Sequence, residues 1–365
     1  RTELRLKAMR LPGLPMAIAD GRGFEAALDA FAADPPDVIH VHGLGSVGLL
    51  GVWAADRLEV PLLVTWHTDF EAYADHYAGL TPFVDTYYRL LKVATQGMKR
   101  PALQDMRRWL RVKWWKRGMS RRSLLNAARD MLEAADLVTT PSDKTATRVR
   151  ELAPSARIKV VPNGADALPE GKPLPHRAGP RILYVGRIAP EKNIQLLLEA
   201  FEWVREEIPN AELMFVGDWN TSGWLEAKLA LARRRGGVTL MGQIPREELG
   251  PYYASADVFA FPSLTDTQAL VLHEAAHAGL PIVSVDHELR LVLDDGVNGA
   301  IARPTPESLA RQLVMQLHKL EDPEYKATAQ ARSREMAGWW TIEHQSAAIL
   351  ELYRDLAARR PIEES

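Results

Sequence analysis

The chain has 365 residues, 47% hydrophobic and 25% charged, a composition that excludes disordered and fibrous proteins and at this length favours two α/β domains of about 150 residues. It contains no cysteine, which excludes disulfides, thiolate catalysis and cysteine-bound metals. Its net charge of -2 argues against a dedicated nucleic-acid-binding protein, and no apolar run approaches the roughly 18 residues needed to cross a bilayer.

In the first half of the chain, short apolar runs alternate with helical patterns. A helix is expected over 24–33. Strands are expected at 38–42, 62–66, 137–140 and 158–161. Because these strands are short, almost wholly apolar and separated by helices, they predict a parallel sheet that is covered on both faces.

A second series of strands and helices follows a segment rich in Pro and Gly at 168–180, which is the best candidate for a linker. The helix over 194–208 places its apolar residues on one buried face. The expected strands are 182–186, 213–217, 238–242, 258–261 and 282–285. This order is typical of a Rossmann-like domain, in which successive βαβ units build a parallel sheet.

The densest group of chemically informative residues is FPSLTDTQALVLHEAAHAGLPIV, residues 261–283. In open α/β sheets, ligands bind beyond the carboxyl ends of the strands, and a helix that starts near Gln268 offers unpaired N–H groups to a diphosphate. Glu274 lies in the second turn of that helix, where its carboxylate can accept hydrogen bonds from vicinal hydroxyls. Asp266 lies in the loop before the helix.

This segment resembles the signature of retaining GT-B glycosyltransferases, of the group 1 and family 4 type, and among them bacterial diacylglycerol glycosyltransferases and mannosyltransferases. The resemblance implies an α/β protein with two Rossmann-like domains facing across a cleft. We expect 1–167 to be the acceptor-side domain, 168–340 the nucleotide-sugar domain, and 341–365 a final helix that packs back on the first domain. The family opens with a strand and a Gly-rich loop that are not found after Arg1, so the first domain is expected to be incomplete at its start.

The resemblance also implies roles for individual residues. Glu274 would bind the ribose of the donor, and Asp266 would bind hydroxyls of the transferred sugar. Asp266 stands where Glu is commoner, and Ala269 where the family usually has Gly, which alters the backbone approach to the sugar phosphate. Further donor contacts are expected from Ile244, Gln268, Ala269 and Leu270.

A second informative segment, GRIAPEKN at 186–193, follows the first strand of the second domain. Gly186 lets the turn pass close to a ligand, while Arg187 and Lys192 place two cations at the sheet edge. In the family, these positions hold the donor diphosphate. Many glycosyltransferases of the other main fold bind a divalent ion with a DxD motif, in which two Asp residues are two positions apart. No two Asp residues of this chain have that spacing, and the two cations can take the place of the ion. The sequence therefore predicts a metal-independent enzyme without a cofactor.

In the first domain, the TWHTDF segment places His67 beyond a strand end. The HT element of the family's active site lies at this position, so His67 is expected near the anomeric carbon, and His40 and His42 are expected to be structural or to line the acceptor site. The PNGAD segment resembles the family's interdomain loop, which implies that Asn163 and Gly164 face the cleft, with Asn163 among the donor-binding residues. The implied reaction is front-face attack with retention of configuration, in which the donor phosphate helps to deprotonate the acceptor.

Part of the first signature also matches another class of enzyme. His273, Glu274 and His277 form an HExxH pattern, which in zinc proteases supplies two ligands and a general base. A zinc site needs a third ligand, and its helix must hold both imidazoles at an open site. Here Gly279 and Pro281 end the helix immediately after His277. The sequence therefore disfavours a zinc metalloprotease.

Between residues 99 and 122, ten Lys or Arg stand against one Asp, with tryptophans interleaved. A helix there places Trp109 and Trp114 largely apart from Arg111 and Lys113. Such a helix lies in an anionic membrane surface, or it packs its tryptophans on the core, and both interpretations stay open. The TDTQ segment favours the membrane, because it is similar to bacterial glycosyltransferases that act on diacylglycerol-type lipids. This interpretation implies a cytoplasmic enzyme at the inner face of the cell membrane.

The sequence thus predicts a hexosyltransferase that uses a UDP- or GDP-linked sugar and a membrane lipid acceptor. One alternative is the same enzyme with a soluble acceptor. Another, from a different class, is a noncatalytic protein that binds sugar nucleotides. No nucleic-acid partner is expected.

Overall fold

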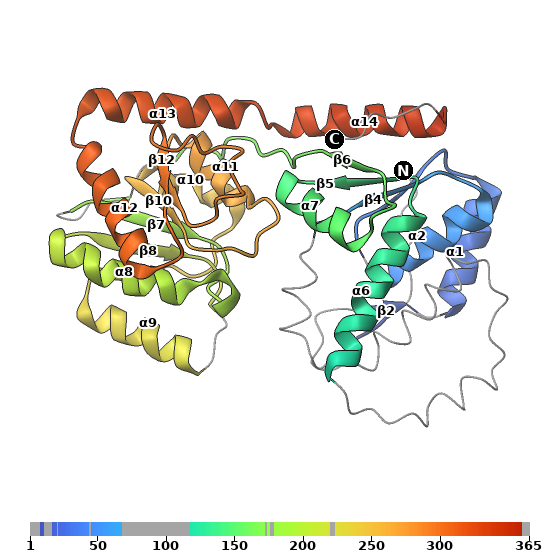
Figure 1. The fold of residues 1–365 in the computed structure, drawn as a ribbon, viewed down its shortest axis with the longest axis horizontal. Helices are drawn as coiled ribbons and strands as arrows, with labels where there is room; N and C mark the ends of the chain where they lie inside the picture. The colour runs from blue at the N-terminus through green and yellow to red at the C-terminus, as the bar shows by residue number, and fades with distance from the viewer. Residues whose placement is uncertain are drawn as a thin grey trace. The chain divides into compact units, whose positions relative to one another are not determined.

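The structure is a computed structural model that describes residues 8–10, 17–19, 21–43, 45–67, 117–171, 174–175, 179–219 and 223–359. The chain divides into two compact units, the first formed by 1–161 with 347–365 and the second by 162–346. Each unit contains a parallel sheet with helices, as the sequence predicts (Figure 1). The domain limits expected at 167 and 340 remain predictions.

The first unit is built on a parallel sheet in the order β3-β4-β5-β6. Its strands are β3 (Ile39–Val41), β4 (Leu62–Thr65), β5 (Leu137–Thr140) and β6 (Ile158–Val160). Its helices are α1 (Gly21–Ala33), α2 (Ser46–Leu58), α6 (Arg117–Ala134) and α7 (Asp143–Leu152), and a short antiparallel pair joins β1 (Ala8–Arg10) to β2 (Ala17–Ala19). The strands expected in this half of the chain are therefore confirmed.

Both faces of the first sheet are buried, because successive residues of a strand point to opposite sides. Val64 belongs to the cluster formed with the helices on one face. Leu63 belongs to a second cluster, which includes Leu352 and Leu356 of α14 (Ile342–Ala357). The final helix thus starts in the second unit and contributes its later turns to the core of the first.

The second unit contains a parallel sheet in the order β12-β11-β10-β7-β8-β9. Its strands are β7 (Arg181–Val185), β8 (Glu212–Val216), β9 (Val238–Leu240), β10 (Val258–Phe261), β11 (Ile282–Ser284) and β12 (Gly299–Ile301). Its helices are α8 (Ile194–Glu207), α9 (Trp224–Arg235), α10 (Gly250–Ala254), α11 (Leu270–His277), α12 (Pro306–Lys319) and α13 (Pro323–Gly338), with 3-10 turns η2 (Pro190–Lys192) and η3 (Arg246–Glu248). The sequence predicted all of these strands except β12, whose three residues lie at the sheet edge.

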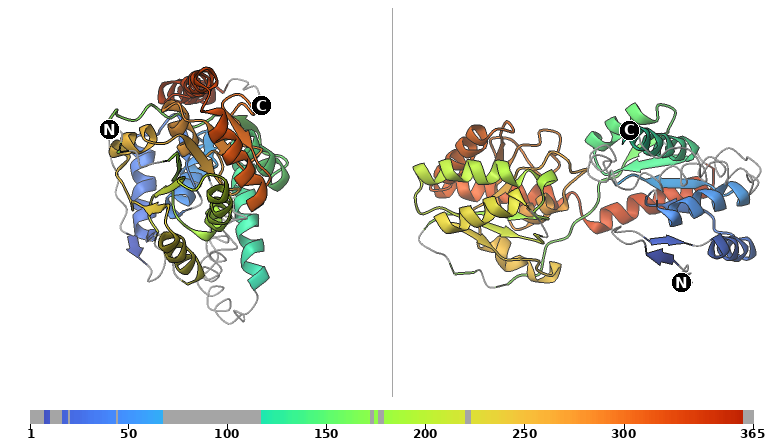
Figure 2. Two further views of the ribbon diagram at one scale, coloured as in Figure 1. Left: turned by 90° about the vertical axis from the view of Figure 1, so that its left-hand side faces the viewer. Right: turned by 90° about the horizontal axis from the view of Figure 1, so that it is seen from below.

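Two buried clusters cover the faces of this sheet. Helices α8, α9 and α12 cover one face of the sheet, and α10, α11 and α13 cover the other (Figures 1 and 2). Ile182 and Tyr184 of β7 belong to the first cluster, and Leu183 and Val185 belong to the second. This double burial explains why the strands are apolar at nearly every position. It leaves only the ends of the strands for polar groups.

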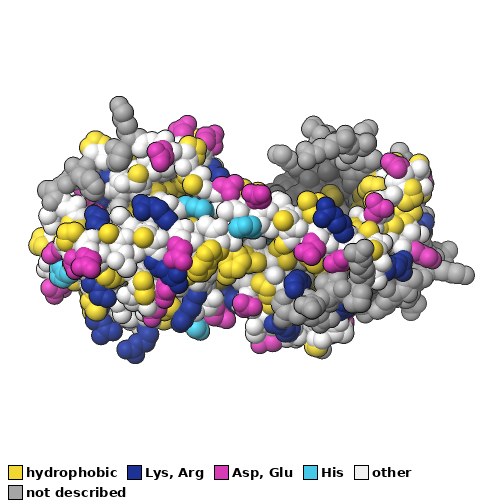
Figure 3. Space-filling model, turned by 90° about the horizontal axis from the view of Figure 1, so that it is seen from above, with side chains coloured by type: hydrophobic (Ala, Val, Ile, Leu, Met, Phe, Trp, Pro, Cys, Tyr) yellow, Lys and Arg dark blue, Asp and Glu magenta, His cyan; other side chains and the backbone are white. Residues whose placement is uncertain are grey.

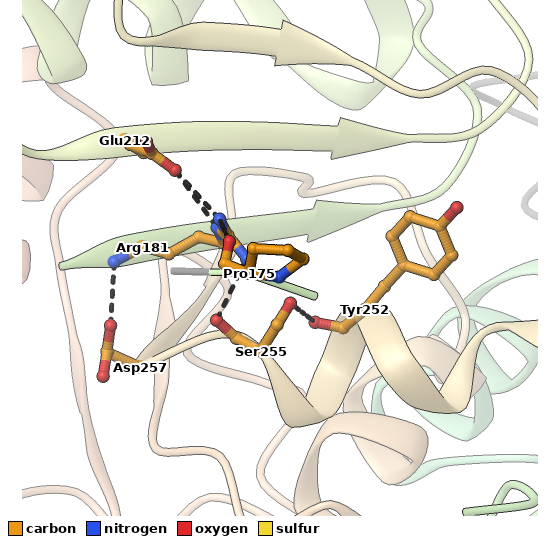
Figure 4. Close-up of polar contacts among 6 residues, drawn as sticks. All are labelled: Pro175, Arg181, Glu212, Tyr252, Ser255 and Asp257. Atoms are coloured by element: carbon orange, nitrogen blue, oxygen red, sulfur yellow. Dashed lines mark hydrogen bonds and ion pairs between the residues drawn. The ribbon is translucent and has the colours of Figure 1, made fainter. Parts of the chain in front are cut away.

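At the amino ends of these strands lies an ion pair between Arg181 and Glu212, with 3% and 10% of their side chains exposed. The Arg181 guanidinium donates to Glu212 Oε2 from Nε at 3.2 Å and from Nη2 at 3.1 Å, and also to the carbonyl oxygens of Pro175 and Ser255 (Figure 4). The Arg181 backbone N–H donates to Asp257 at 2.8 Å. These contacts join β7, β8 and the start of β10 at one edge of the sheet, and the carboxyl ends of the strands lie at the other.

Candidate functional site

The order of the second sheet has a switch point at β7, because β8 and β9 lie on one side of it and β10 to β12 on the other. Ligands of open α/β sheets bind at such a point, beyond the carboxyl ends of the strands. The loop after β7 contains Gly186, Arg187 and Lys192, and the loop after β10 contains Asp266. The topology therefore brings both predicted segments to the same edge.

Lys192 and Asp266 are in direct contact, although 74 residues separate them in the sequence, with 2.6 Å between Nζ and Oδ1. Their side chains are 18% and 19% exposed. Beside them, the Thr265 hydroxyl donates to the carbonyl oxygen of Glu191 at 3.1 Å. The structure thus joins the two loops at adjacent positions and pairs two predicted catalytic residues.

The second carboxylate oxygen of Asp266 is unusual. Oδ2 is buried and has no hydrogen-bond partner among the described residues. A buried acceptor without a donor costs about 1–3 kcal/mol. A ligand hydroxyl would supply the missing donor, so the pair offers an ammonium group and a hydroxyl acceptor side by side.

The turn after β7 presents a more exposed cation. Gly186 has φ 146°, a conformation that favours glycine, and the Tyr184 hydroxyl donates to the Arg187 carbonyl at 2.8 Å. The Arg187 side chain is 62% exposed, and its Nη2 lies 3.0 Å from Oε1 of Glu191. Because exposed ion pairs contribute little, a phosphate can compete with Glu191 for this guanidinium. Sequence reasoning missed Glu191, although its position four residues after Arg187 was a usable signal.

Glu274 lies on α11 with only 6% of its surface exposed. Arg246 Nε donates to Oε1 at 2.9 Å, and the Tyr253 hydroxyl donates to Oε2 at 3.0 Å. Burial, and then the charge of Glu274, raises the pKa of Tyr253 well above its usual value, so this hydroxyl remains a donor. Each carboxylate oxygen accepts about two hydrogen bonds, which leaves capacity for vicinal ligand hydroxyls. Sequence reasoning missed both partners of Glu274. Only Arg246 could have been suspected, because it lies next to the loop of Ile244, where donor contacts were expected.

The start of α11 shows what the departure at Ala269, noted in the sequence, costs. Ala269 has φ 61°, the left-handed conformation that favours glycine, at a cost of about 1–2 kcal/mol for a residue with a side chain. Leu270, the first helical residue, is 42% exposed. Ile244 is partly buried against the core cluster that includes α11. The N–H groups at the start of α11 thus follow a strained turn at the sheet edge.

Gln268 and Asn163, both predicted to bind the donor, bind each other. Gln268 accepts from the Asn163 N–H at 2.7 Å and donates to the Asn163 carbonyl at 2.8 Å. Both imidazoles of the HExxH pattern are likewise used within the protein, since His273 Nε2 lies 3.0 Å from Gln268 Nε2 and His277 Nε2 lies 2.6 Å from the Ala165 carbonyl. No three His, Asp or Glu side chains in the described part of the chain are grouped to hold a metal ion. These contacts give no support to a zinc protease.

In the first unit, His67 lies just beyond β4, beside two other histidines. His67 Nε2 is 3.2 Å from His42 Nδ1, and the His40 and His42 ring centroids are 4.0 Å apart. His40 is held by the Tyr353 hydroxyl at 2.7 Å and by the Thr65 hydroxyl at 2.6 Å. Burial lowers the pKa of His67, with a further contribution from His42, so the ring is neutral at pH 7. Nothing in the sequence indicated that Tyr353, on α14, contacts His40.

This cluster predicts a loss of stability on acidification. Burial, followed by the charges of His42 and His67, lowers the pKa of His40 from 6.5 to about 3. Between these values the unfolded chain binds a proton that the folded chain does not, so stability decreases as pH falls from 6.5 towards 3. Urea unfolding at about pH 7.5 and pH 5 is expected to show a smaller decrease for His40→Asn than for the wild type. His344→Asn, at an exposed position, is the matched control and should keep the wild-type dependence. An unchanged pH dependence in His40→Asn would contradict this account.

The predicted membrane residues Trp109, Arg111, Lys113 and Trp114 lie outside the described residues. Among the helices that are described, none combines the length and hydrophobicity required to cross a bilayer.

Two family models match the chain, one described as glycosyl transferases group 1 over residues 179–319 and the other as Glycosyltransferase Family 4 over 3–167. The chain is 26% identical over 349 residues to an alpha-monoglucosyldiacylglycerol synthase of Streptococcus pneumoniae, covering 88% of this chain and 71% of that protein. It is 28% identical to a GDP-mannose-dependent alpha-mannosyltransferase of Mycobacterium tuberculosis, covering 71% and 58%.

The fold is similar to two solved structures. Sucrose-phosphate synthase of Thermosynechococcus elongatus matches with a TM-score of 0.66 and 21% identity, covering 96% of this chain and 83% of that one. Alr3699/HepE of Anabaena, solved with UDP and glucose, matches with a TM-score of 0.64 and 17% identity, covering 92% and 82%.

Proposed function

Because this chain belongs to the glycosyltransferases of the GT-B fold, with a group 1 domain and a family 4 domain, we propose that it transfers a hexose from a nucleotide-diphosphate sugar with retention of configuration. The main support is the placement of the Lys192–Asp266 pair in the loops after β7 and β10, and of Glu274 on the helix that follows β10. These residues combine a cation, a hydroxyl acceptor with a free oxygen, and a buried carboxylate. In this proposal, the cation suits the diphosphate of a nucleotide sugar, the free oxygen suits a hydroxyl of the sugar, and the buried carboxylate suits the hydroxyls of the ribose.

The donor is proposed to be UDP- or GDP-linked. One relative is named for GDP-mannose, and the Anabaena protein was solved with UDP and glucose. In this proposal the diphosphate faces Arg187, Lys192 and the start of α11, and the base contacts the loop of Ile244. Two unit charges about 4 Å apart at an effective dielectric near 20 interact by about 4 kcal/mol before desolvation, so two cations make a strong diphosphate site. Glu274 would bind the ribose.

The proposed reaction breaks the bond between C1 of the sugar and the phosphate oxygen and forms a bond from C1 to the acceptor oxygen on the same face. The acceptor proton passes to the departing phosphate. Lys192 and Arg187 stabilise the charge that develops there, which is the kind of preorganised electrostatic effect that dominates many enzymes. Oδ2 of Asp266 accepts a sugar hydroxyl, and neutral His67 is proposed as a further catalytic residue.

Removing Glu274 is expected to weaken nucleotide binding more than removing Asp266. Glu274→Ala deletes hydrogen bonds to a charged group, worth about 1.5–3 kcal/mol, which corresponds to a roughly 10- to 100-fold increase in Kd. Asp266→Ala should leave the affinity for UDP or GDP almost unchanged, because it is proposed to contact only the sugar. Calorimetric titration of each variant with the free nucleotide measures the difference, with Glu202→Ala on α8 as the control. Equal losses in both variants would be evidence against these roles.

Chelation is expected to leave the transfer rate unchanged. Arg187 and Lys192 are proposed to supply the positive charge that a divalent ion supplies elsewhere. Initial rates are measured after dialysis against EDTA and again after adding Mg²⁺ or Mn²⁺. A rate that disappears with EDTA and returns with either ion would refute metal independence.

The acceptor is proposed to be a membrane lipid, reached from the inner face of the cell membrane. Two relatives are named as alpha-monoglucosyldiacylglycerol synthases. On the face in Figure 3, Lys or Arg and Asp or Glu side chains of the described residues are interspersed. The proposed membrane contact is assigned to the basic segment at 99–122 from its sequence. Transfer to diacylglycerol in anionic vesicles, with flotation at low salt, tests this proposal. Transfer to soluble sugars alone would favour a soluble acceptor, and nucleotide binding without transfer or donor hydrolysis would favour a noncatalytic binding protein.

A further inference from the structure

Asn163 and Gly164, in the PNGAD segment, are held between two glutamine side chains. Gln268 accepts from the Asn163 N–H at 2.7 Å and donates to the Asn163 carbonyl at 2.8 Å. Gln345 accepts from the Gly164 N–H at 2.9 Å and donates to Asn163 Oδ1 at 3.1 Å. Each glutamine therefore uses both ends of its amide on this segment, and we call the pair the glutamine clamp.

The Gln268 amide has no hydrogen left for a ligand. The side chain is 3% exposed, and its Nε2 also lies 3.0 Å from Nε2 of His273. Burial lowers the pKa of His273 to about 4, so this ring is neutral and accepts the second hydrogen at Nε2. At the other end of α11, His277 Nε2 donates to the Ala165 carbonyl at 2.6 Å. Residues at both ends of α11 thus contact the same segment.

Residues 340 and 341, just before α14, also contact the PNGAD segment. The Ala165 N–H donates to the Trp340 carbonyl at 2.9 Å. A Cβ atom on Gly164 would lie 2.2 Å from the carbonyl oxygen of Thr341, so only glycine fits there. The segment is therefore fixed by close backbone approach as well as by the glutamine clamp.

We propose that Gln268 and Gln345 are positioning residues for donor binding, which hold residues 163–165 against the start of α11. The inference rests on the proposed function, in which the first N–H groups of α11 face the donor diphosphate. Gln268 immediately precedes Ala269, the left-handed residue from which α11 begins. A strained turn persists only when its surroundings fix it, and the two bonds to Asn163 do so. Loss of the clamp weakens nucleotide binding without removing a group that touches the nucleotide.

Gln268→Glu is the informative change, because it keeps the size of the side chain and removes its donor. The new carboxylate would face the Asn163 carbonyl, which repels it. His273 does not, because its Nδ1 has no partner among the described residues and the neutral ring can carry its hydrogen at Nε2 instead. Burial raises the pKa of a carboxyl group, so lowering the pH restores a neutral side chain with one donor. A residue that only fills space would show no such rescue.

The experiment combines amide hydrogen exchange with calorimetric titration of UDP and of GDP on the whole chain. At about pH 8, Gln268→Glu is expected to speed amide exchange at Asn163 and Gly164 by about tenfold. At the same pH it is expected to weaken binding of the nucleotide that the wild type binds by about tenfold. At about pH 5.5, the difference in affinity between the variant and the wild type should fall below about threefold. Gln316→Glu is the matched control. Gln316 is also buried, at 2% exposed, and its amide donates to the Tyr325 hydroxyl between α12 and α13. This control should leave exchange at Asn163 and nucleotide affinity unchanged.

Unchanged exchange at Asn163 in Gln268→Glu, or binding equally weak at both pH values, would overturn the clamp. If Gln268→Glu does not fold, Gln345→Ala serves instead, because Gln345 is only partly buried, and faster exchange at Gly164 is then expected. Binding of neither nucleotide by the wild type would instead count against the proposed function, and exchange at Asn163 and Gly164 would still decide whether the clamp exists.

Discussion

Lys192→Met is expected to lower kcat for glycosyl transfer by about 10²- to 10³-fold, the scale of losing one preorganised charge-stabilising group. The ammonium group lies 2.6 Å from Asp266 in a site that is largely shielded from water, so its charge is weakly screened. Methionine keeps the length and packing of the side chain but leaves the departing phosphate without this cation. Initial rates at saturating donor measure the effect.

Lys228→Met is the control for this substitution. Lys228 also forms an ion pair, 2.8 Å from Glu199, but both side chains are about 40% exposed, and the pair joins α9 to α8 rather than the two loops. Its removal should leave kcat unchanged. A Lys192→Met enzyme with near-normal kcat and an unchanged melting temperature would mean that Lys192 does not stabilise the departing group.

The sequence placed Lys192 and Asp266 at the same sheet edge through topology, but it did not predict their direct contact. Each residue follows an apolar strand, and carboxyl ends of parallel strands meet at one sheet edge, so the two loops had to converge if β7 and β10 were neighbours. The strands themselves were predictable because both faces are buried and nearly every position is apolar. The same logic predicted that α8 buries a single face, since its apolar residues recur at helical spacing.

The partners of Glu274 were not predictable in this way. Arg246 and Tyr253 approach it from η3 and α10, and which polar side chains of neighbouring turns reach a buried carboxylate depends on packing that periodicity does not encode. The bond between Tyr353 and His40 spans 313 residues and depends on where α14 packs. For Gln268, a position in the family signature indicated donor contact, whereas the structure shows that Asn163 and His273 use its amide.

Arg181→Met is expected to destabilise the second unit by about 3–5 kcal/mol, because it leaves the buried Glu212 carboxylate without its partner. For a unit of this size, that corresponds to a melting temperature lower by roughly 10 °C. The guanidinium also donates to the carbonyls of Pro175 and Ser255, which lose their donors (Figure 4). Urea unfolding followed by circular dichroism measures the loss.

The change should spare catalysis in the folded protein, since Arg181 and Gly186 lie at opposite ends of a strand about 16 Å long. The double variant Arg181→Met with Glu212→Leu is expected to recover part of the stability, because it removes the unpaired charge and replaces a desolvated ion pair by apolar packing. Arg235→Met, which breaks a largely exposed pair with Glu202, is the control and should have little effect. A double variant as unstable as Arg181→Met alone would show that the lost bonds to the Pro175 and Ser255 carbonyls, rather than the unpaired carboxylate, determine the cost.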